Sequence, residues 1–596
     1  MHKTLNWQNP ATPAVAGERP QLSGAPGAGG RWGSDRIAEL LRALDLKFVC
    51  LNPGSSFRGL HDSLVNGLGN EDPQLLLCLH EEHAVAIAHG YARVTGRPLA
   101  VALHANVGLM HAAMAIFNAW CDRVPMFILG GTGPLDAAKR RPFIDWIHST
   151  RDQASMVRGY VKWDDQPTSL AAAEEALLRA FQLGMTAPMG PVYVNLDSEI
   201  QESPLADEPP APRLERFRPL ADVSPSENAL GAAVDLLKGA KRPAILMGRL
   251  SRDEGNWAKR IQLAEKLGAM VATDLKVGAA FPTAHPLHVG SPGMSLTKEA
   301  LSQLGEADVI LSLDWVDLAG ALTTIWPRKS CPAKVIHVSL DHQLHNGTGF
   351  EYHALPEVDL HIATTPEVFV ADLADRLPAT GKSYSTKKRP SKRMPTGSQG
   401  ELGLAEIASA LQEASGEQPV SLMRLPLGWD GSFTEFSHPL DQLGHSGGGG
   451  VGSGPGMAVG AALALMDTDH LPVAILGDGD TLMGITAIWT AVHYKIPLLI
   501  IAANNRSFFN DELHQERVAR RRQRPVENRW IGQRIDDPAP DIAMMARAQG
   551  AIGVGPICDR MTLDSEMRKA VEMVRAGKVV VLDVHIAVGY AAAGAS

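Results

Sequence analysis

Two short motifs, Gly477-Asp478-Gly479 and Asn504-Asn505, constrain this chain of 596 residues more than any other stretch. The apolar run at residues 471–476 predicts a buried strand, and residues 481–495 carry apolar side chains at helical spacing. A second apolar run follows at residues 496–503. The order of strand, glycine turn, helix and strand is typical of a parallel α/β sheet.

Asp478 and Asn505 each follow one of these two predicted strands. The carboxyl ends of parallel strands are where α/β proteins bind ligands. Carboxylate and amide oxygens beside a helix N-terminus suit Mg²⁺ together with a diphosphate. The alternative is a strand that ends in a simple Asp-Gly turn, with two loop asparagines of no special role.

Length and composition indicate a soluble globular protein of three or four domains. At 596 residues the chain is too long for one core, and 45% hydrophobic with 20% charged residues is ordinary for globular proteins. The net charge of −9 argues against a nucleic-acid footprint. Five scattered cysteines form no CxxC pair, and neither a signal peptide nor a spanning stretch is recognised, so we expect a reducing, cytoplasmic location without membrane contact.

Alternation of helical and strand patterns predicts an α/β protein with three doubly wound parallel-sheet domains. The segments expected are a flexible arm, three domains and a basic linker between the second and third domains. They are placed at residues 1–31 (arm), 32–205, 220–377 (central, Rossmann-like), 378–400 (linker) and 401–596.

A second motif lies far from the first, at residues 78–98, CLHEEHAVAIAHGYARVTGRP. The spacing of 27 residues between Asp478 and Asn505 resembles the cofactor motif of thiamine diphosphate (ThDP) enzymes. The second motif resembles their pyrimidine-binding domain, where a glutamate stands nine residues before the glycine of GYAR. Counting back from Gly90 gives Glu81 rather than Glu82. Taken alone, both acids are solvated first-turn residues favoured by the helix dipole.

The resemblance implies the domain roles and the cofactor site. The domain at 32–205 is expected to bind the pyrimidine and that at 401–596 the diphosphate. Glu81 would share a proton with the cofactor's N1′ and so help form its reactive ylid, and Mg²⁺ would take Asp478, Asn505 and the backbone carbonyl of Ser507. The other cofactor-binding residues implied are Gly452, Ser453, Gly454, Met457, Gly477, Gly479 and Asp480.

The glycine-rich loop before residue 454 departs from the family pattern. Ser453 stands where the family usually has a bulky apolar residue under the bent cofactor, so either Val451 or Met457 supplies this support or the cofactor is held differently. Gly447, Gly449 and Gly452 also satisfy GxGxxG, but without a preceding strand this is a weak sign of dinucleotide binding.

Two further residues resemble those of the benzoylformate decarboxylase branch. His104, followed by Asn118 and Trp120, matches an acid/base histidine, and Ser55 in NPGSS matches a serine that contacts the substrate carboxylate. Each could equally be a structural hydrogen-bonding group. That branch's second histidine has no counterpart at residues 309–320.

The implied reaction is decarboxylation or carboligation of a 2-oxo acid or related carbonyl compound through an enamine, with His104 as proton relay. The arginine run at 520–524 keeps a second hypothesis open, a carbon–carbon lyase or hydrolase of a diketone or 2-hydroxyacyl-CoA. A third is a non-catalytic ThDP-fold binding protein. The resemblance also implies a homodimer or, by expectation, a homotetramer, because Glu81 of one subunit faces the diphosphate of another. FAD or a nucleotide in the central domain is conceivable but has no support in the sequence.

Overall fold

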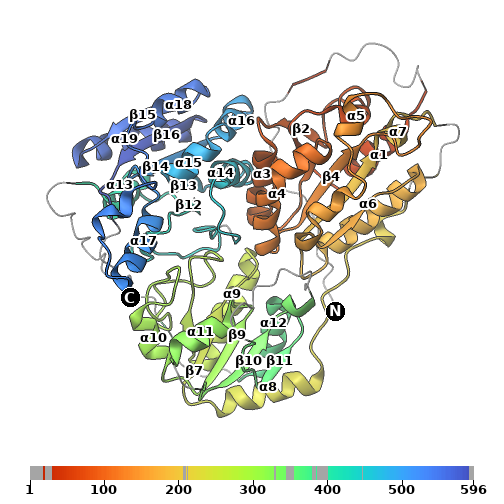
Figure 1. Ribbon diagram of the computed structural model, residues 1–596. Helices are drawn as coiled ribbons and strands as arrows, with labels where there is room; N and C mark the ends of the chain where they lie inside the picture. The colour runs from red at the N-terminus through yellow and green to blue at the C-terminus, as the bar shows by residue number, and fades with distance from the viewer. Residues whose placement is uncertain are drawn as a thin grey trace.

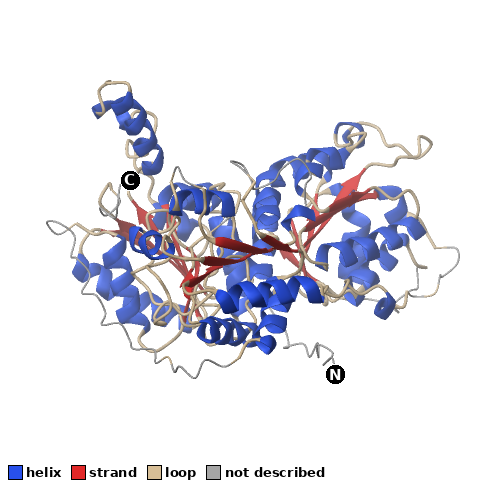
Figure 2. Ribbon diagram, turned by 90° about the horizontal axis from the view of Figure 1, so that it is seen from below, coloured by secondary structure: helices blue, strands red, loops and turns tan. Residues whose placement is uncertain are grey.

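Three parallel sheets, each covered by helices on both faces, make up the computed structural model of the protein (Figures 1 and 2). The structure describes residues 18–20, 30–205, 210, 212–327, 330–343, 355–378, 384, 401–445 and 447–589. The prediction of three α/β parallel-sheet domains is confirmed. The predicted domain limits stay predictions, and the arm at 1–31 and the linker at 378–400 lie almost wholly outside the described residues.

The N-terminal sheet has the strand order β2-β1-β3-β4-β6-β5. Its strands are β1 Phe48–Leu51, β2 Gln74–Leu77, β3 Ala100–Leu103, β4 Met126–Thr132, β5 Trp163–Asp165 and β6 Pro191–Asp197. Its helices are α1 Gly33–Ala43, α2 Arg58–Asp62, α3 Glu81–Thr95, α4 Ala105–Cys121, α5 Ile144–Ile147, α6 Leu170–Met185 and α7 Ser198–Glu202. The buried strands β1, β3, β4 and β6 explain the near-continuous apolar runs of this region.

The central sheet has the order β11-β10-β9-β7-β8. Its strands are β7 Pro243–Met247, β8 Met270–Ala272, β9 Val309–Leu313, β10 Lys334–Val338 and β11 Leu360–Ile362. Its helices are α8 Glu227–Gly239, α9 Glu254–Leu267, α10 Lys298–Leu304, α11 Leu318–Ile325 and α12 Pro366–Arg376. In Figure 1 this domain lies below the other two.

The C-terminal sheet has the order β12-β13-β14-β16-β15. Its strands are β12 Val420–Arg424, β13 Leu471–Gly477, β14 Leu498–Asn504, β15 Ile552–Ile557 and β16 Val579–His585. Its helices are α13 Leu404–Ser415, α14 Gly454–Leu465, α15 Asp478–Gly484, α16 Ala487–His493, α17 Phe509–Arg521, α18 Ile542–Ala548 and α19 Arg560–Arg575. The strand, turn, helix and strand predicted around Asp478 are present, with the helical run divided into α15 and α16.

Helices α3 and α14 join the N-terminal and C-terminal domains, and one apolar core continues from one domain into the other (Figure 1). A Cβ on Gly90 would lie 2.0 Å from the carbonyl oxygen of Met457, and one on Gly460 would lie 1.8 Å from that of Ile87. The two backbones therefore touch directly, which only glycine permits at these positions. In the part of the chain that the structure describes, we find no helix with the length and apolarity needed to cross a membrane.

Candidate functional site

The C-terminal half of the candidate site lies where two neighbouring strands end. Asp478 begins α15 directly after β13, and Asn505 directly follows β14. The backbone N–H of Ser507 donates to both side chains, at 3.2 Å to Oδ2 of Asp478 and 2.9 Å to Oδ1 of Asn505. The two oxygen-bearing groups predicted 27 residues apart in sequence are thus brought together at the ends of β13 and β14, where the N–H of Ser507 bridges them.

Burial raises the pKa of Asp478 to about 6, although backbone N–H groups of Gly479 and Ser507 donate to it. A buried carboxylate that only N–H dipoles stabilise is a group that a nearby cation would favour strongly. Together with the amide oxygen of Asn505 it forms a hard-oxygen donor set that fits a divalent cation such as Mg²⁺.

A cavity of about 610 Å³ opens beside these residues. Gly477, Asp478, Gly479, Asp480, Asn505 and Ser507 line it, together with Val451 and with Cys121 and Asp122 from the end of α4. Its size is that of a site for a cofactor-sized molecule. Val451 is 42% exposed and on this wall, whereas Met457 is buried and is not among the described wall residues.

Both carboxylate oxygens of Asp480 contact groups of the protein itself. Its Oδ1 accepts from the backbone N–H groups of Gly452, at 2.6 Å, and Gly454, at 3.2 Å. Its Oδ2 pairs with Nε of Arg424 at 2.9 Å. Asp480 therefore fixes the glycine-rich loop that borders the cavity.

Ser453 points away from the cavity toward the N-terminal domain. Its hydroxyl donates to Oε1 of Glu82 at 2.9 Å and accepts from Nδ2 of Asn118 at 3.2 Å. The side chain is 1% exposed and lies at the junction of α3, α4 and α14. This contact gives Ser453 a structural reason to be small and polar where the family pattern has a bulky residue.

The N-terminal half of the candidate site lies at the ends of β2, β1 and β3, which are neighbours in the sheet. Glu81 follows β2 as the first residue of α3 and is 7% exposed. Its Oε2 accepts from Nδ1 of His111 on α4 at 3.0 Å, and a Cβ on Gly108 would lie 3.3 Å from its Oε1. Glu81 is therefore the more buried acid of the pair, because Glu82 is half-buried, and its role as the cofactor glutamate stays a prediction.

His104 follows β3 and precedes α4. Its Nδ1 lies 3.0 Å from Oγ of Ser56, and a Cβ on Gly54 would come within 2.3 Å of its ring. Ala105 has a φ of 45°, an uncommon backbone conformation of the kind found at functional sites. Ser55 is exposed in a hollow of about 390 Å³, so its neighbour Ser56 is the serine that contacts His104.

The 610 Å³ cavity is lined by only one of the two halves within one chain. Among the described residues, Glu81, His104 and Ser55 are absent from the wall of the 610 Å³ cavity. Cys121, the last residue of α4, lines that cavity. His104 precedes the other end of the same helix, and 17 residues of α-helix are about 25 Å long.

Four contacts of these residues escaped the sequence reasoning: His111 with Glu81, Ser56 with His104, Arg424 with Asp480, and Glu512 with Ser507. The last is a hydrogen bond of 2.6 Å from Oγ of Ser507 to a fully buried carboxylate. Ser56 stands in the NPGSS motif and Glu512 stands seven residues after Asn505, so both lie within or next to the motifs. No sequence motif near His111 or Arg424 indicates their contacts, because their partners come from other elements.

The central sheet has a cavity of about 510 Å³ at the carboxyl ends of β7, β9 and β10. Arg249 pairs there with Asp314 at 2.9 Å and also with Asp341, which in turn pairs with Arg123 at 2.8 Å. Of the buried side-chain polar atoms of these four residues, only Nη1 of Arg249 lacks a hydrogen-bond partner among the described residues, and the ion pairs indicate no particular ligand. The presence of FAD or a nucleotide stays a prediction without support.

Three family models match the chain and together cover more than half of it: the N-terminal thiamine pyrophosphate (ThDP) binding domain of thiamine pyrophosphate enzymes at residues 31–156, their central domain at 230–355 and their C-terminal binding domain at 428–584. The large subunit of acetolactate synthase from Haemophilus influenzae is 25% identical over 93% of this chain and 94% of its own length. The sulfoacetaldehyde acetyltransferase of Alcaligenes xylosoxydans xylosoxydans is 26% identical over 86% of each chain.

Solved structures agree in fold. A thiamine diphosphate-dependent 4-hydroxybenzoylformate decarboxylase from Rhodococcus jostii superimposes with a TM-score of 0.76 at 22% identity, over 94% of this chain and 100% of its own. The benzoylformate decarboxylase of Polynucleobacter necessarius gives 0.75 at 20% identity, over 94% and 99%. The chain therefore belongs to the thiamine pyrophosphate enzymes, the thiamine diphosphate-dependent family.

Proposed function

We propose that this protein is a ThDP- and Mg²⁺-dependent lyase or transferase that cleaves a 2-oxo acid or related carbonyl compound, by decarboxylation, carboligation or both. The proposal rests on one observation: the backbone N–H of Ser507 donates to the side chains of both Asp478 and Asn505, and all three residues line the 610 Å³ cavity. Relatives named acetolactate synthase and sulfoacetaldehyde acetyltransferase, and structural neighbours named decarboxylases, support this class of reaction.

The residues of the C-terminal half would hold the metal. Asp478 and Asn505 would bind Mg²⁺ through their side-chain oxygens and Ser507 through its backbone carbonyl, while Gly477, Gly479 and the loop from Gly452 to Gly454 would border the diphosphate. Burial disfavours the charged form of Asp478, and a bound Mg²⁺ would compensate the charge of this carboxylate. This attraction would favour metal binding.

ThDP supplies a nucleophilic carbon and an electron sink for the cleaved bond. Glu81 would hold a proton at the pyrimidine nitrogen of the cofactor, and the imidazole of His111 fixes the orientation of its carboxyl group. His104, fixed through Nδ1 by Ser56, would exchange a proton with the substrate through Nε2. Ser55 would contact the substrate carboxylate from its exposed position at the end of β1.

A complete site would then need two chains. Glu81 does not line the 610 Å³ cavity that Asp478 lines within the chain, which supports a homodimer as the minimal active unit and is compatible with a homotetramer.

A substrate screen of protein loaded with ThDP and Mg²⁺ tests the proposal. Carbon dioxide release is measured with pyruvate, phenylglyoxylate and branched 2-oxo acids, each with and without an acceptor aldehyde or oxo acid, and product analysis separates an aldehyde from a ligated product. Cleavage of acyl-CoA or diketone substrates without carbon dioxide release would replace the proposal by the lyase or hydrolase alternative. Failure of ThDP and Mg²⁺ to change the thermal midpoint or circular dichroism would overturn cofactor use.

A further inference from the structure

A second histidine lies beside His104. The ring of His148 stands perpendicular to that of His104, with 4.8 Å between the ring centroids and 85° between the planes. Ser56 occupies Nδ1 of His104, so Nε2 remains for proton exchange. Nδ1 of His148 is buried and has no hydrogen-bond partner among the described residues. His148 follows β4, which is the next strand after β3 in the sheet.

The chain on both sides of His148 is fixed to the start of α4. Nδ2 of Asn106 donates to the carbonyl of Ile147 at 3.3 Å and to the hydroxyl of Thr150 at 3.1 Å. Asn106 itself is buried and stands two residues after His104. These contacts hold the two histidines in a fixed relation to each other.

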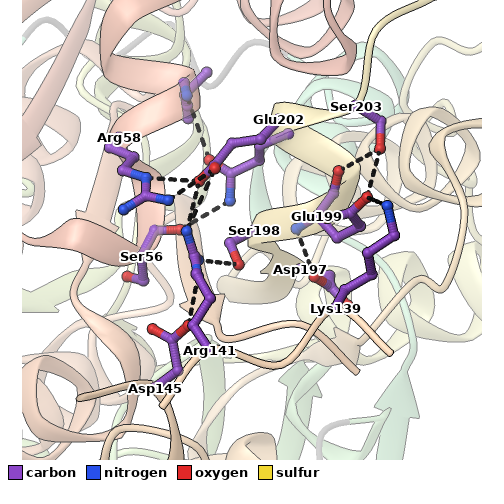
Figure 3. A network of polar contacts seen from close by, with 12 residues as sticks. Ser56, Arg58, Lys139, Arg141, Asp145, Asp197, Ser198, Glu199, Glu202 and Ser203 are labelled. Atoms are coloured by element: carbon purple, nitrogen blue, oxygen red, sulfur yellow. Dashed lines mark hydrogen bonds and ion pairs between the residues drawn. The ribbon is translucent and has the colours of Figure 1, made fainter. Parts of the chain in front are cut away.

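An arginine clamp fixes the same segment from its other end (Figure 3). Nε of Arg141 pairs with Asp145 at 2.6 Å, and its other nitrogens reach the hydroxyl of Ser198 at 2.9 Å and Glu202 at 3.4 Å. Glu202 also pairs with Arg58, the first residue of α2, at 2.8 Å and 2.9 Å. The clamp thus ties the segment that carries His148 to the ends of β1 and β6.

The charges around His104 favour one bound proton on the two histidine rings together and disfavour a second. Burial lowers the pKa of His104, and the positive charge of a protonated His148 lowers it further. The carboxylates of Glu81 on α3 and Asp145 on the clamped segment act in the opposite direction. Two imidazolium ions at this separation repel each other, so protonating one ring disfavours protonating the other.

We propose that His148 is the second histidine of the reacting pocket and that it shares a single proton with His104. This inference rests on the proposed function, because the proton serves a carbonyl substrate beside His104. When His104 gives its proton to the substrate, both rings are left neutral, and a proton from solvent restores the pair. Because its ring lies against that of His104, His148 would also help determine which acyl groups fit beside His104.

The kinetic test compares His148→Phe, which keeps a ring without nitrogens, with His148→Gln and with the control His342→Gln, an exposed histidine of the central domain. We expect kcat of His148→Phe to fall by about 100-fold with ThDP binding unchanged. The limb of the kcat–pH profile that reports His104 should move to higher pH, because the neighbouring positive charge is gone. A limb that stays in place, whatever the loss of kcat, would overturn the pairing.

A second measurement does not depend on turnover. NMR of the protein labelled at histidine Cε1, with His104 assigned through His104→Gln, follows the titration of His104 directly. The His104 resonance should titrate at higher pH in His148→Phe than in the native protein, and an unchanged titration would contradict the inference. Native protein that turns over no substrate while this titration shifts would refute the proposed function and leave the histidine pair intact.

Discussion

Glu81 and Glu82 are adjacent acids with different surroundings, and they provide a matched pair of variants. Glu81 is held by His111 at the end of β2, whereas Glu82 accepts from Ser453 between the domains. We expect Glu81→Gln to lower kcat by at least 100-fold while Mg²⁺-diphosphate binding persists, because the amide cannot exchange a proton. Glu82→Gln should keep most of the turnover and lower the thermal midpoint. Titration calorimetry and steady-state kinetics of both variants check this, and equal activity of Glu81→Gln and native protein would remove Glu81 from the mechanism.

His83 makes the fold sensitive to acid. Burial, aided by His80, lowers its pKa from 6.5 to about 4. The folded state therefore favours the neutral ring, so the stabilisation is complete above about pH 6.5 and is lost as the pH falls toward 4. At about 1.4 kcal/mol per pH unit this amounts to about 3 kcal/mol. Thermal midpoints measured from pH 7 to 4 should fall less steeply for His83→Gln than for the native protein, and parallel curves would contradict the assignment.

Among helices, the crossing of α3 and α14 depends on glycine. A methyl group on Gly460 would meet the backbone of Ile87, so the helices would have to separate and the shared core would lose contacts. We expect Gly460→Ala to lower the thermal midpoint by several degrees and Gly231→Ala, in α8 with open space around it, to leave it unchanged or raise it slightly. Calorimetry of both variants decides, and a Gly460→Ala protein as stable as the native one would refute the close crossing.

The elements that could be predicted from sequence are those with long apolar runs. β13 and β14 have seven residues each and were expected from the apolar runs at residues 471–476 and 496–503. The three-residue strands β5, β8 and β11 were not, because so short a segment has no resolvable period. The run at 481–495 was expected as one helix, but it is interrupted at residues 485–486, where sequence periodicity shows no break.

The same limit applies to the site. Asp478, Asn505 and Glu81 stand in motifs with fixed spacing, and the topology alone places them at strand ends. The contacts of His104 with His148 and of Glu81 with His111 join different elements, and their geometry depends on packing across the sheet edge. No local pattern contains that information, so a second histidine was sought in the central domain rather than after β4.

At the scale of the whole molecule, the separation of the two half-sites predicts complementation between chains. Glu81→Gln and Asp478→Ala should each be nearly inactive alone. If the site forms between subunits, random assortment of the two variants in mixed oligomers gives about a quarter of the sites both intact groups, so co-expressed variants should recover about a quarter of the native activity. If Glu81 and Asp478 act within one chain, no mixed oligomer contains an intact site and activity stays at the level of the variants. Differently tagged chains separate these outcomes when they are assayed beside each variant alone. The unfractionated mixture should show about a quarter of the native activity, and mixed dimers purified through both tags should show about half. The tandem-purified sample itself reports whether the chains associate.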